Sequence, residues 1–232
     1  MKKIGLIGGM SWESTALYYK IINEEVKKKL GGSHSAECLM YSFDFQEVEE
    51  LQSAGKWDEL TDIMVNWAIK LKEAGADFIV ICANTMHLMA PAIEDKAKIS
   101  VLHIADVTGR SVIKAGLKKV VLLGTKYVME GTFYKDVLKN LHDVDVIVPS
   151  KENRQIIHDI IYSELIKGII SEKSKEKYIE IISELFSLGA EGVVLGCTEI
   201  PLLIKQEDFT SPVFNTTEIH SKAAVEYALK TD

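Results

Sequence analysis

Short apolar runs alternate along this chain with longer stretches in which apolar residues recur every three or four positions. The runs predict buried strands at Ile4–Ile7, Glu37–Phe43, Phe78–Ile81, Val101–Ile104, Val120–Leu123, Val144–Val148, Val193–Leu195 and Val213–Phe214. The longer stretches predict amphipathic helices, of which Trp57–Glu73 is the clearest. Strands that are apolar throughout suit parallel sheets covered on both faces. The alternation therefore predicts an α/β protein.

The pattern repeats once along the chain. Gly75-Ala76-Asp77 aligns with Gly189-Ala190-Glu191, and Ile4–Gly8 aligns with Val120–Gly124 at nearly the same offset. A constant offset predicts two similar halves. We expect two small domains related by pseudo-two-fold symmetry, each with a four-stranded parallel sheet flanked by helices. Their predicted bounds are residues 1–104 plus 214–232 for the first and 105–213 for the second, with the last helix crossing back to the first domain.

The same alignment pairs two strand ends that differ at one chemically important position. FIVICANTMH (Phe78–His87) lies over GVVLGCTEIP (Gly192–Pro201), so that Cys197 falls opposite Ala83. Cys82 is one position earlier. Since neighbouring side chains of a strand point to opposite faces, we expect Cys82 to point away from the site and to be structural.

Composition and charge exclude several classes of protein. The 232 residues fit one large domain or two of about 100 residues each. The formal charge is −7 and no Lys/Arg cluster marks a nucleic-acid surface. The longest apolar runs are far below the ~20 residues of a membrane span. Met1-Lys2-Lys3 leads directly into a strand and lacks the features of a signal peptide, which favours the cytoplasm.

The three cysteines, Cys38, Cys82 and Cys197, favour thiol chemistry. An odd, low count argues against a disulfide framework. No Cys or His pair has zinc-site spacing, so we expect no metal. Gly5-x-x-Gly8-Gly9 lacks the spacing of a dinucleotide fingerprint.

Small and hydroxylated residues follow the predicted strands. They stand at Gly8–Ser11, Ala83–Thr85, Gly124-Thr125 and Cys197–Glu199. Ligands of parallel α/β sheets bind beyond the carboxyl ends of the strands, where free N–H groups of following helices hold carboxylates. If the halves face each other, all four ends converge on one cleft. At a helix N-terminus, Cys197 is expected to have a stabilised thiolate.

GMSWEST, CANTMH and GCTEI, in that order and spacing, resemble the motifs of the aspartate/glutamate racemase family. The resemblance spans essentially the whole chain. It implies racemisation of aspartate or glutamate without pyridoxal phosphate or metal, by two cysteines that address opposite faces of the α-carbon. It also implies a homodimer.

Carried over position by position, the resemblance makes Cys197 one base and places the second base at Ala83. Met10 and Ser11 would line the site, and Gln52 would lie near the substrate side chain. The residues implied to hold the α-carboxylate and α-ammonium are Asn84, Thr85, Thr125 and Thr198. Glu199 would orient a partner or bind the ammonium, or would only complement a helix N-terminus. No arginine after the second strand matches the family contact for a distal carboxylate.

The side chain of alanine can neither accept nor donate a proton, and three explanations for Ala83 stay open. An engineered replacement of cysteine would leave an inactivated enzyme. A natural one-cysteine member would act on one enantiomer or use water as its partner. A one-sided reaction such as decarboxylation would need only one thiol. Outside catalysis, a silent protein that binds an acidic amino acid is the further alternative.

Overall fold

The computed structural model describes residues 1–230 and divides the chain into two compact units. The first unit contains Met1–His103 and the C-terminal residues from His220 onward; the second is Ile104–Ile219. Each unit is an α/β layer structure built on its own parallel sheet. The assignment of residues 1–104 plus 214–232 and of 105–213 to racemase-like domains stays a prediction.

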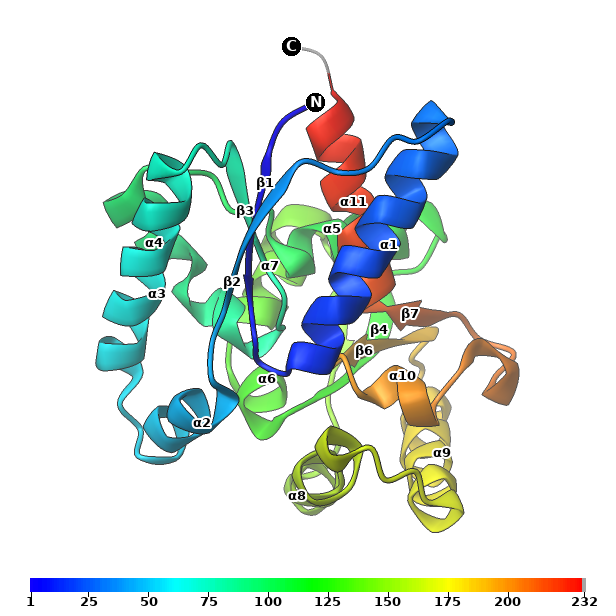
Figure 1. Cartoon of the computed structure of the whole chain (residues 1–232). Helices are drawn as coiled ribbons and strands as arrows, with labels where there is room; N and C mark the ends of the chain where they lie inside the picture. The colour runs from blue at the N-terminus through cyan, green and yellow to red at the C-terminus, as the bar shows by residue number, and fades with distance from the viewer. Residues whose placement is uncertain (231–232) are drawn as a thin grey trace. The chain divides into compact units, whose positions relative to one another are not determined.

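The first unit has a sheet of three strands in the order β2-β1-β3. Its elements are β1 (Ile4–Gly8), α1 (Trp12–Leu30), β2 (Cys38–Ser42), α2 (Phe45–Ser53), α3 (Trp57–Glu73), β3 (Phe78–Ile81), the 3₁₀ helix η1 (Thr85–Met89), α4 (Ala90–Ala97) and the greater part of α11 (Thr216–Leu229). Helices α1 and α11 lie side by side on one face (Figure 1). Helices α3 and α4 pack on the other.

The predicted fourth strand of this sheet, Val101–Ile104, is wrong. Val101 forms only an isolated parallel bridge to Ile79, closed by hydrogen bonds from Ile79 to Ser100 (2.8 Å) and from Leu102 to Ile79 (2.9 Å). Helix α5 begins at Ile104, so the chain leaves the sheet after a single bridge. A short apolar run fits the first turn of a buried helix as well as a buried strand, so the run alone does not distinguish the two.

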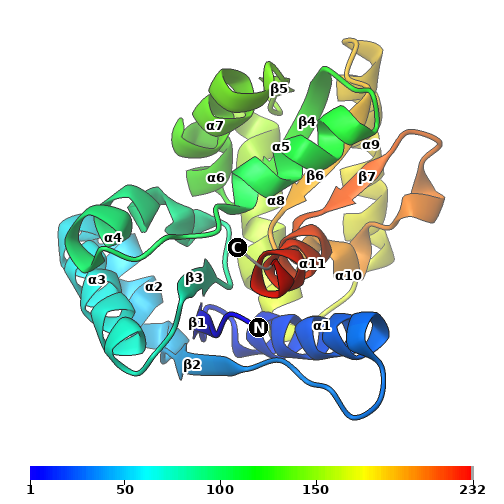
Figure 2. The same ribbon diagram turned by 90° about the horizontal axis from the view of Figure 1, so that it is seen from above.

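The second unit has four strands in the order β5-β4-β6-β7. Its elements are α5 (Ile104–Lys114), β4 (Lys119–Gly124), α6 (Lys126–Glu130), α7 (Phe133–His142), β5 (Asp145–Ile147), α8 (Lys151–Ser163), η2 (Leu165–Lys167), α9 (Glu172–Ser187), β6 (Gly192–Gly196), α10 (Ile200–Leu203), η3 (Gln206–Asp208) and β7 (Val213–Asn215). Helices α8 and α9 cover one face, and α5 and α7 cover the other, as Figure 2 shows.

The internal repeat is visible as one recurring local structure. Gly75 and Gly189 both have positive φ, 101° and 88°, and each ends a helix before a strand. The acid two positions later binds the start of the central strand: Asp77 accepts a hydrogen bond from the N–H of Lys3, and Glu191 accepts from Lys119 at 2.9 Å. These glycines have a conformational reason to recur, because side chains are disfavoured at that φ.

In both units the first strand in sequence, β1 or β4, is central and parallel to its neighbours. Registers Ile7↔Ile81 and Gly124↔Gly196 bring the ends of β1 and β3 together, and likewise those of β4 and β6. Among the described residues, no helix is long and apolar enough to cross a membrane.

Candidate active site

Cys197, Thr198 and Glu199 form a hydrogen-bonded cluster immediately after β6. The thiol of Cys197 donates to Oε2 of Glu199 (2.9 Å), and the hydroxyl of Thr198 donates to the same oxygen (2.7 Å). All three side chains are buried. The chain turns here because Gly196 ends the strand and Pro201 stands in the first turn of α10. The carboxylate is therefore held as an acceptor for a thiol proton.

This arrangement favours the neutral thiol of Cys197 over its thiolate. Burial raises its pKa well above the ordinary value, and the adjacent Glu199 carboxylate raises it further. Backbone N–H groups of Glu199 and Thr198 act in the opposite direction, but they are outweighed. The expected thiolate stabilised by a helix N-terminus is thus wrong: α10 is only four residues long, and burial together with the Glu199 carboxylate outweighs the backbone N–H groups.

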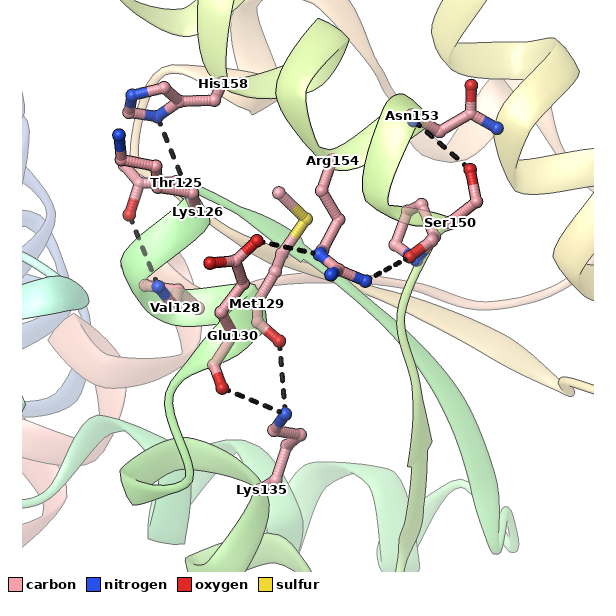
Figure 3. Close-up of polar contacts among 11 residues, drawn as sticks. Thr125, Lys126, Val128, Met129, Glu130, Lys135, Ser150, Asn153, Arg154 and His158 are labelled. Carbon is pink, nitrogen blue, oxygen red and sulfur yellow. Dashed lines mark hydrogen bonds and ion pairs between the residues drawn. The ribbon is translucent and has the colours of Figure 1, made fainter.

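Thr125 lies on the neighbouring strand end, where β4 enters α6. Its hydroxyl oxygen caps α6 by accepting from the N–H of Val128 (3.4 Å). The next N–H, of Lys126, donates to Nδ1 of His158 on α8 (3.4 Å), as Figure 3 shows. Burial lowers the pKa of His158, and the positive charge of Lys126 lowers it further. The register Gly124↔Gly196 places Thr125 and Cys197 at adjacent strand ends.

One ion pair and several contacts to backbone carbonyl groups hold this corner of the second unit in place. Arg154 donates to Glu130 (3.2 Å) and to the carbonyl of Pro149 (2.8 Å), which joins α8 to the end of α6. Lys135 donates to the carbonyl of Met129 (3.2 Å) from the other side (Figure 3). Because Arg154 already has protein acceptors, it is part of the scaffold rather than an open anion site.

The first turn of the first unit is fixed by Thr15. Its hydroxyl accepts from the N–H of Gly9 (2.8 Å) and donates to the carbonyl of Ser11 (2.9 Å). A Cβ on Gly8 would lie 2.3 Å from the Thr15 side chain, so only glycine permits this approach. Met10 and Ser11 are buried in the turn, and Ser11 caps α1 by accepting from Ser14 (3.4 Å).

Ala83, Asn84 and Thr85 follow β3 and are all buried. Ala83 packs with Ile7 and Ile81 on the α3 face of the sheet, whereas Cys82 packs with Leu6 and Val80 on the α1 face. This confirms that the two neighbouring side chains point in opposite directions. Burial raises the pKa of Cys82, with the nearby Cys38 adding to the shift. Cys82 is therefore an inert core thiol.

Gln52 contacts the segment that follows β3. It is buried near the end of α2, and its side-chain amide contacts the sulfur of Met86 at 3.2 Å. The predicted substrate residue thus lies beside the NTMH motif within the first unit.

Sequence reasoning missed a histidine cluster behind Ala83. His87 donates from Nδ1 to the carbonyl of Ala83 (2.9 Å), and its ring lies 4.9 Å from that of His103 and 5.3 Å from that of His220. His220 bonds the hydroxyl of Tyr18 (2.9 Å) through Nδ1 and the carbonyl of Leu102 (2.7 Å) through Nε2. No local pattern signals this cluster, because its members are far apart in sequence.

The structure therefore groups the predicted residues by unit. Met10, Ser11, Gln52, Ala83, Asn84 and Thr85 lie at the strand ends of the first unit or packed against them. Thr125, Cys197, Thr198 and Glu199 lie at those of the second. Within the described part of the chain, no group of three His, Cys, Asp or Glu side chains is arranged to hold a metal ion.

Both units are parallel α/β structures, and the second carries a cysteine hydrogen-bonded to a glutamate at a strand end. The chain belongs to the Asp/Glu/Hydantoin racemase family, whose pattern it matches over residues 7–224.

Two solved structures and one curated relative support this. A candidate Asp/Glu racemase from Yersinia pestis is 49% identical, with a TM-score of 0.93 over 99% of this chain and 100% of that chain. An aspartate racemase homologue from Pyrococcus horikoshii OT3 is 38% identical, with a TM-score of 0.85 over the same shares. The broad specificity amino-acid racemase RacX of Bacillus subtilis (strain 168) is 22% identical over 96% of each chain.

Proposed function

We propose that this chain moves the α-proton of an acidic amino acid, aspartate or glutamate, with Cys197 as the acid–base group and without pyridoxal phosphate. The observation that carries the proposal is the hydrogen bond from the Cys197 thiol to Glu199. A neutral thiol is a poor base, and the Glu199 carboxylate at 2.9 Å can accept the thiol proton.

The proton steps balance within this pair. Glu199 takes the proton from sulfur as the substrate arrives, and the resulting thiolate removes the proton from the α-carbon. The electron pair of the broken C–H bond is delocalised into the α-carboxylate. Return of the proton from sulfur to carbon, and of the other proton from Glu199 to sulfur, restores the starting state. Thr198 holds the carboxylate in register by donating to the same oxygen.

The remaining predicted residues take binding roles in this proposal. The hydroxyls and amide of Asn84, Thr85, Thr125 and Thr198 suit the α-carboxylate and α-ammonium. Met10, Ser11 and Gln52 are assigned to the surroundings of the substrate side chain. Each stands at a strand end or is packed against one, which is where parallel α/β sheets bind ligands.

Inversion needs a proton donor for the face of the α-carbon that Cys197 does not reach. The first-unit counterpart is Ala83, whose methyl group has no proton to give. We therefore propose a one-base reaction: exchange of the α-proton with solvent at the face served by Cys197, with inversion slow because water must supply the second proton.

Solvent exchange tests the proposal. The purified chain is incubated in D₂O with each enantiomer of aspartate and glutamate, and loss of the α-proton signal is followed by NMR. We expect exchange of one enantiomer well ahead of the other, abolished by Cys197→Ser. Exchange retained in Cys197→Ser would refute the assignment. Saturable binding without exchange, even in Ala83→Cys, would instead indicate a binding protein, and release of CO₂ from a disubstituted malonate would indicate a decarboxylase.

A further inference from the structure

One residue, His87, holds the segment that follows β3. It is fully buried in η1, and its Nδ1 donates to the carbonyl oxygen of Ala83 (2.9 Å). The backbone N–H of the same residue donates to the carbonyl oxygen of Asn84 (3.1 Å). His87 therefore bonds two successive carbonyl groups, one through its ring and one through its backbone.

These two contacts constrain the backbone conformation of Asn84. A peptide group is planar, so a hydrogen bond that directs its carbonyl bond also constrains the plane of the whole group. The two peptide groups that His87 bonds lie on either side of Asn84 and meet at its α-carbon, where φ is −68° and ψ is −49°. The direction of the Asn84 side chain follows from these two angles, so His87 constrains where that amide points.

The ring of His87 is itself kept in one tautomer. A carbonyl oxygen only accepts, so Nδ1 carries the proton, and Nε2 of the neutral ring carries none. Burial lowers the pKa of His87 well below its ordinary value, and His103 and His220 lower it further. The carbonyl groups of Ala83 and Leu102 act in the opposite direction but are outweighed. The neutral ring therefore has one donor, and that donor serves Ala83.

Two neighbouring histidine rings support the orientation of this ring. The centroids of His103 and His220 lie 4.9 and 5.3 Å from it, at interplanar angles of 64° and 63°. His220 is anchored in turn by the hydroxyl of Tyr18 (2.9 Å) and the carbonyl of Leu102 (2.7 Å). The N–H of Leu102 donates to a carbonyl of β3 (2.9 Å). The support thus comes from the strand whose end is being held.

We propose that His87 is a positioning residue for the reaction at Cys197, because it orients Asn84 to hold the α-carboxylate or α-ammonium group of the substrate. This inference rests on the proposed function, in which Asn84 is a binding residue. His87 acts through Asn84 and is assigned no contact with the substrate.

A histidine that only filled the core would be a costly choice at this place. Nε2 of His87 is buried and has no hydrogen-bond partner among the described residues. Burial of an unpartnered polar nitrogen costs free energy, whereas an apolar side chain of similar size has no such cost. Leucine could fill the space but could not supply the hydrogen bond to Ala83. That bond, rather than the volume of the ring, supports a positioning role.

Three substitutions separate the hydrogen bond from the volume of the ring. In His87→Asn the amide nitrogen lies close to the place of Nδ1 and keeps a donor for Ala83. In His87→Gln the donor lies near the place of Nε2, and His87→Leu has none. We expect kcat/KM for α-proton exchange to fall about tenfold or more in the glutamine and leucine variants, with substantial recovery in the asparagine variant. A merely structural role would change the urea midpoints of all three without this order in kcat/KM.

NMR spectroscopy of the full chain gives a readout that does not depend on turnover. The backbone and side-chain amide resonances of Asn84 should shift in the glutamine and leucine variants and return toward their wild-type positions in the asparagine variant. Tyr18→Phe is the matched control, because it removes a buried hydrogen bond of the same length, 2.9 Å, from the far side of the histidine cluster. It should leave the Asn84 resonances and kcat/KM unchanged.

The outcomes distinguish this inference from the proposed function. Equal effects of the asparagine and glutamine variants, unshifted Asn84 resonances in the leucine variant, or the same loss in Tyr18→Phe would overturn the role of His87. If the leucine variant does not fold, the comparison of asparagine with glutamine decides. If the wild type exchanges no α-proton, the proposed function fails, and the Asn84 resonances alone decide whether His87 orients that residue.

Discussion

The thiol of Cys197 lies 2.9 Å from Oε2 of Glu199 and donates its hydrogen to that carboxylate. The pair is buried after β6, and Thr198 secures it. The sequence left three roles open for Glu199, and the structure shows that its carboxylate accepts a hydrogen bond from this thiol.

Glu199→Gln should lower the pKa of Cys197 and slow α-proton exchange. The substitution removes a negative charge that raises the thiol pKa, but it also removes the acceptor for the thiol proton. We expect the exchange rate to fall about 100-fold or more. Alkylation of Cys197, followed by mass spectrometry against pH, should show a lower midpoint than in the wild type. Unchanged exchange together with an unchanged midpoint would rule out a role for Glu199.

Ala83→Cys should convert one-sided exchange into racemisation. The Ala83 side chain is buried at the end of β3 on the face opposite Cys82, and inversion by the proposed mechanism needs the second thiol at this position. Circular dichroism with either enantiomer as substrate measures interconversion. Ala83→Ser, similar in size but far less acidic, is the control. If both variants racemise no faster than the wild type, the two-base interpretation of position 83 is wrong.

Thr15→Val should loosen the first turn without changing its size. The variant leaves the N–H of Gly9 without its partner inside a buried turn, while the carbonyl of Ser11 keeps the hydroxyl of Ser14 and the N–H of Thr15 as donors. Such a loss costs about 1–3 kcal/mol, measurable by urea unfolding. Thr61→Val, which loses only a helical hydroxyl contact to Trp57, is the matched control and should cost less. Equal costs would mean that Thr15 acts only as a core side chain.

Stability should fall in acid because of the buried histidine cluster. Burial lowers the pKa of His220 to about 3, against about 6.5 in the unfolded chain. The unfolded state therefore binds the proton first. The free energy of unfolding should drop by roughly 1.4 kcal/mol per pH unit for each such histidine between about pH 6.5 and 3. His220→Gln should flatten this slope in urea titrations at a series of pH values. An unchanged slope would exclude His220 as the source.

Stability should also fall in alkali through the buried thiols. Burial raises the pKa of Cys82 above its unfolded value of about 8.5, so the unfolded chain loses the proton first. The contribution is complete below about pH 8.5 and declines as the pH rises beyond it. Urea unfolding between pH 7.5 and 9.5 measures the decline. Cys82→Ala should make it shallower, whatever its cost in packing, while Cys38→Ala at a half-buried position should change it less.

Much of the fold follows from local sequence. The predicted helix Trp57–Glu73 has the observed bounds, because its apolar spacing is regular and Gly75 follows its end. Other elements needed tertiary context. The end of α8 at Ser163 is one of them: Glu164 accepts a hydrogen bond from Ser174 (2.6 Å), and Gly168 adopts a left-handed conformation. The helix α6 is only five residues long, too short to show a helical period in the sequence.

The sequence by itself determined the α/β class, the internal repeat and the alignment of Cys197 with Ala83. These depend on periodicity and on glycines whose φ must be positive, and both are local properties. Tertiary structure alone decided the protonation of Cys197, the histidine cluster at His87 and the single bridge at Val101. The pKa of a thiol depends on the burial and charge that surround it, and those neighbours are set by packing. The motif GCTEI thus supplies the thiol that we propose as the reacting group, while the fold decided that this thiol donates its hydrogen bond to Glu199.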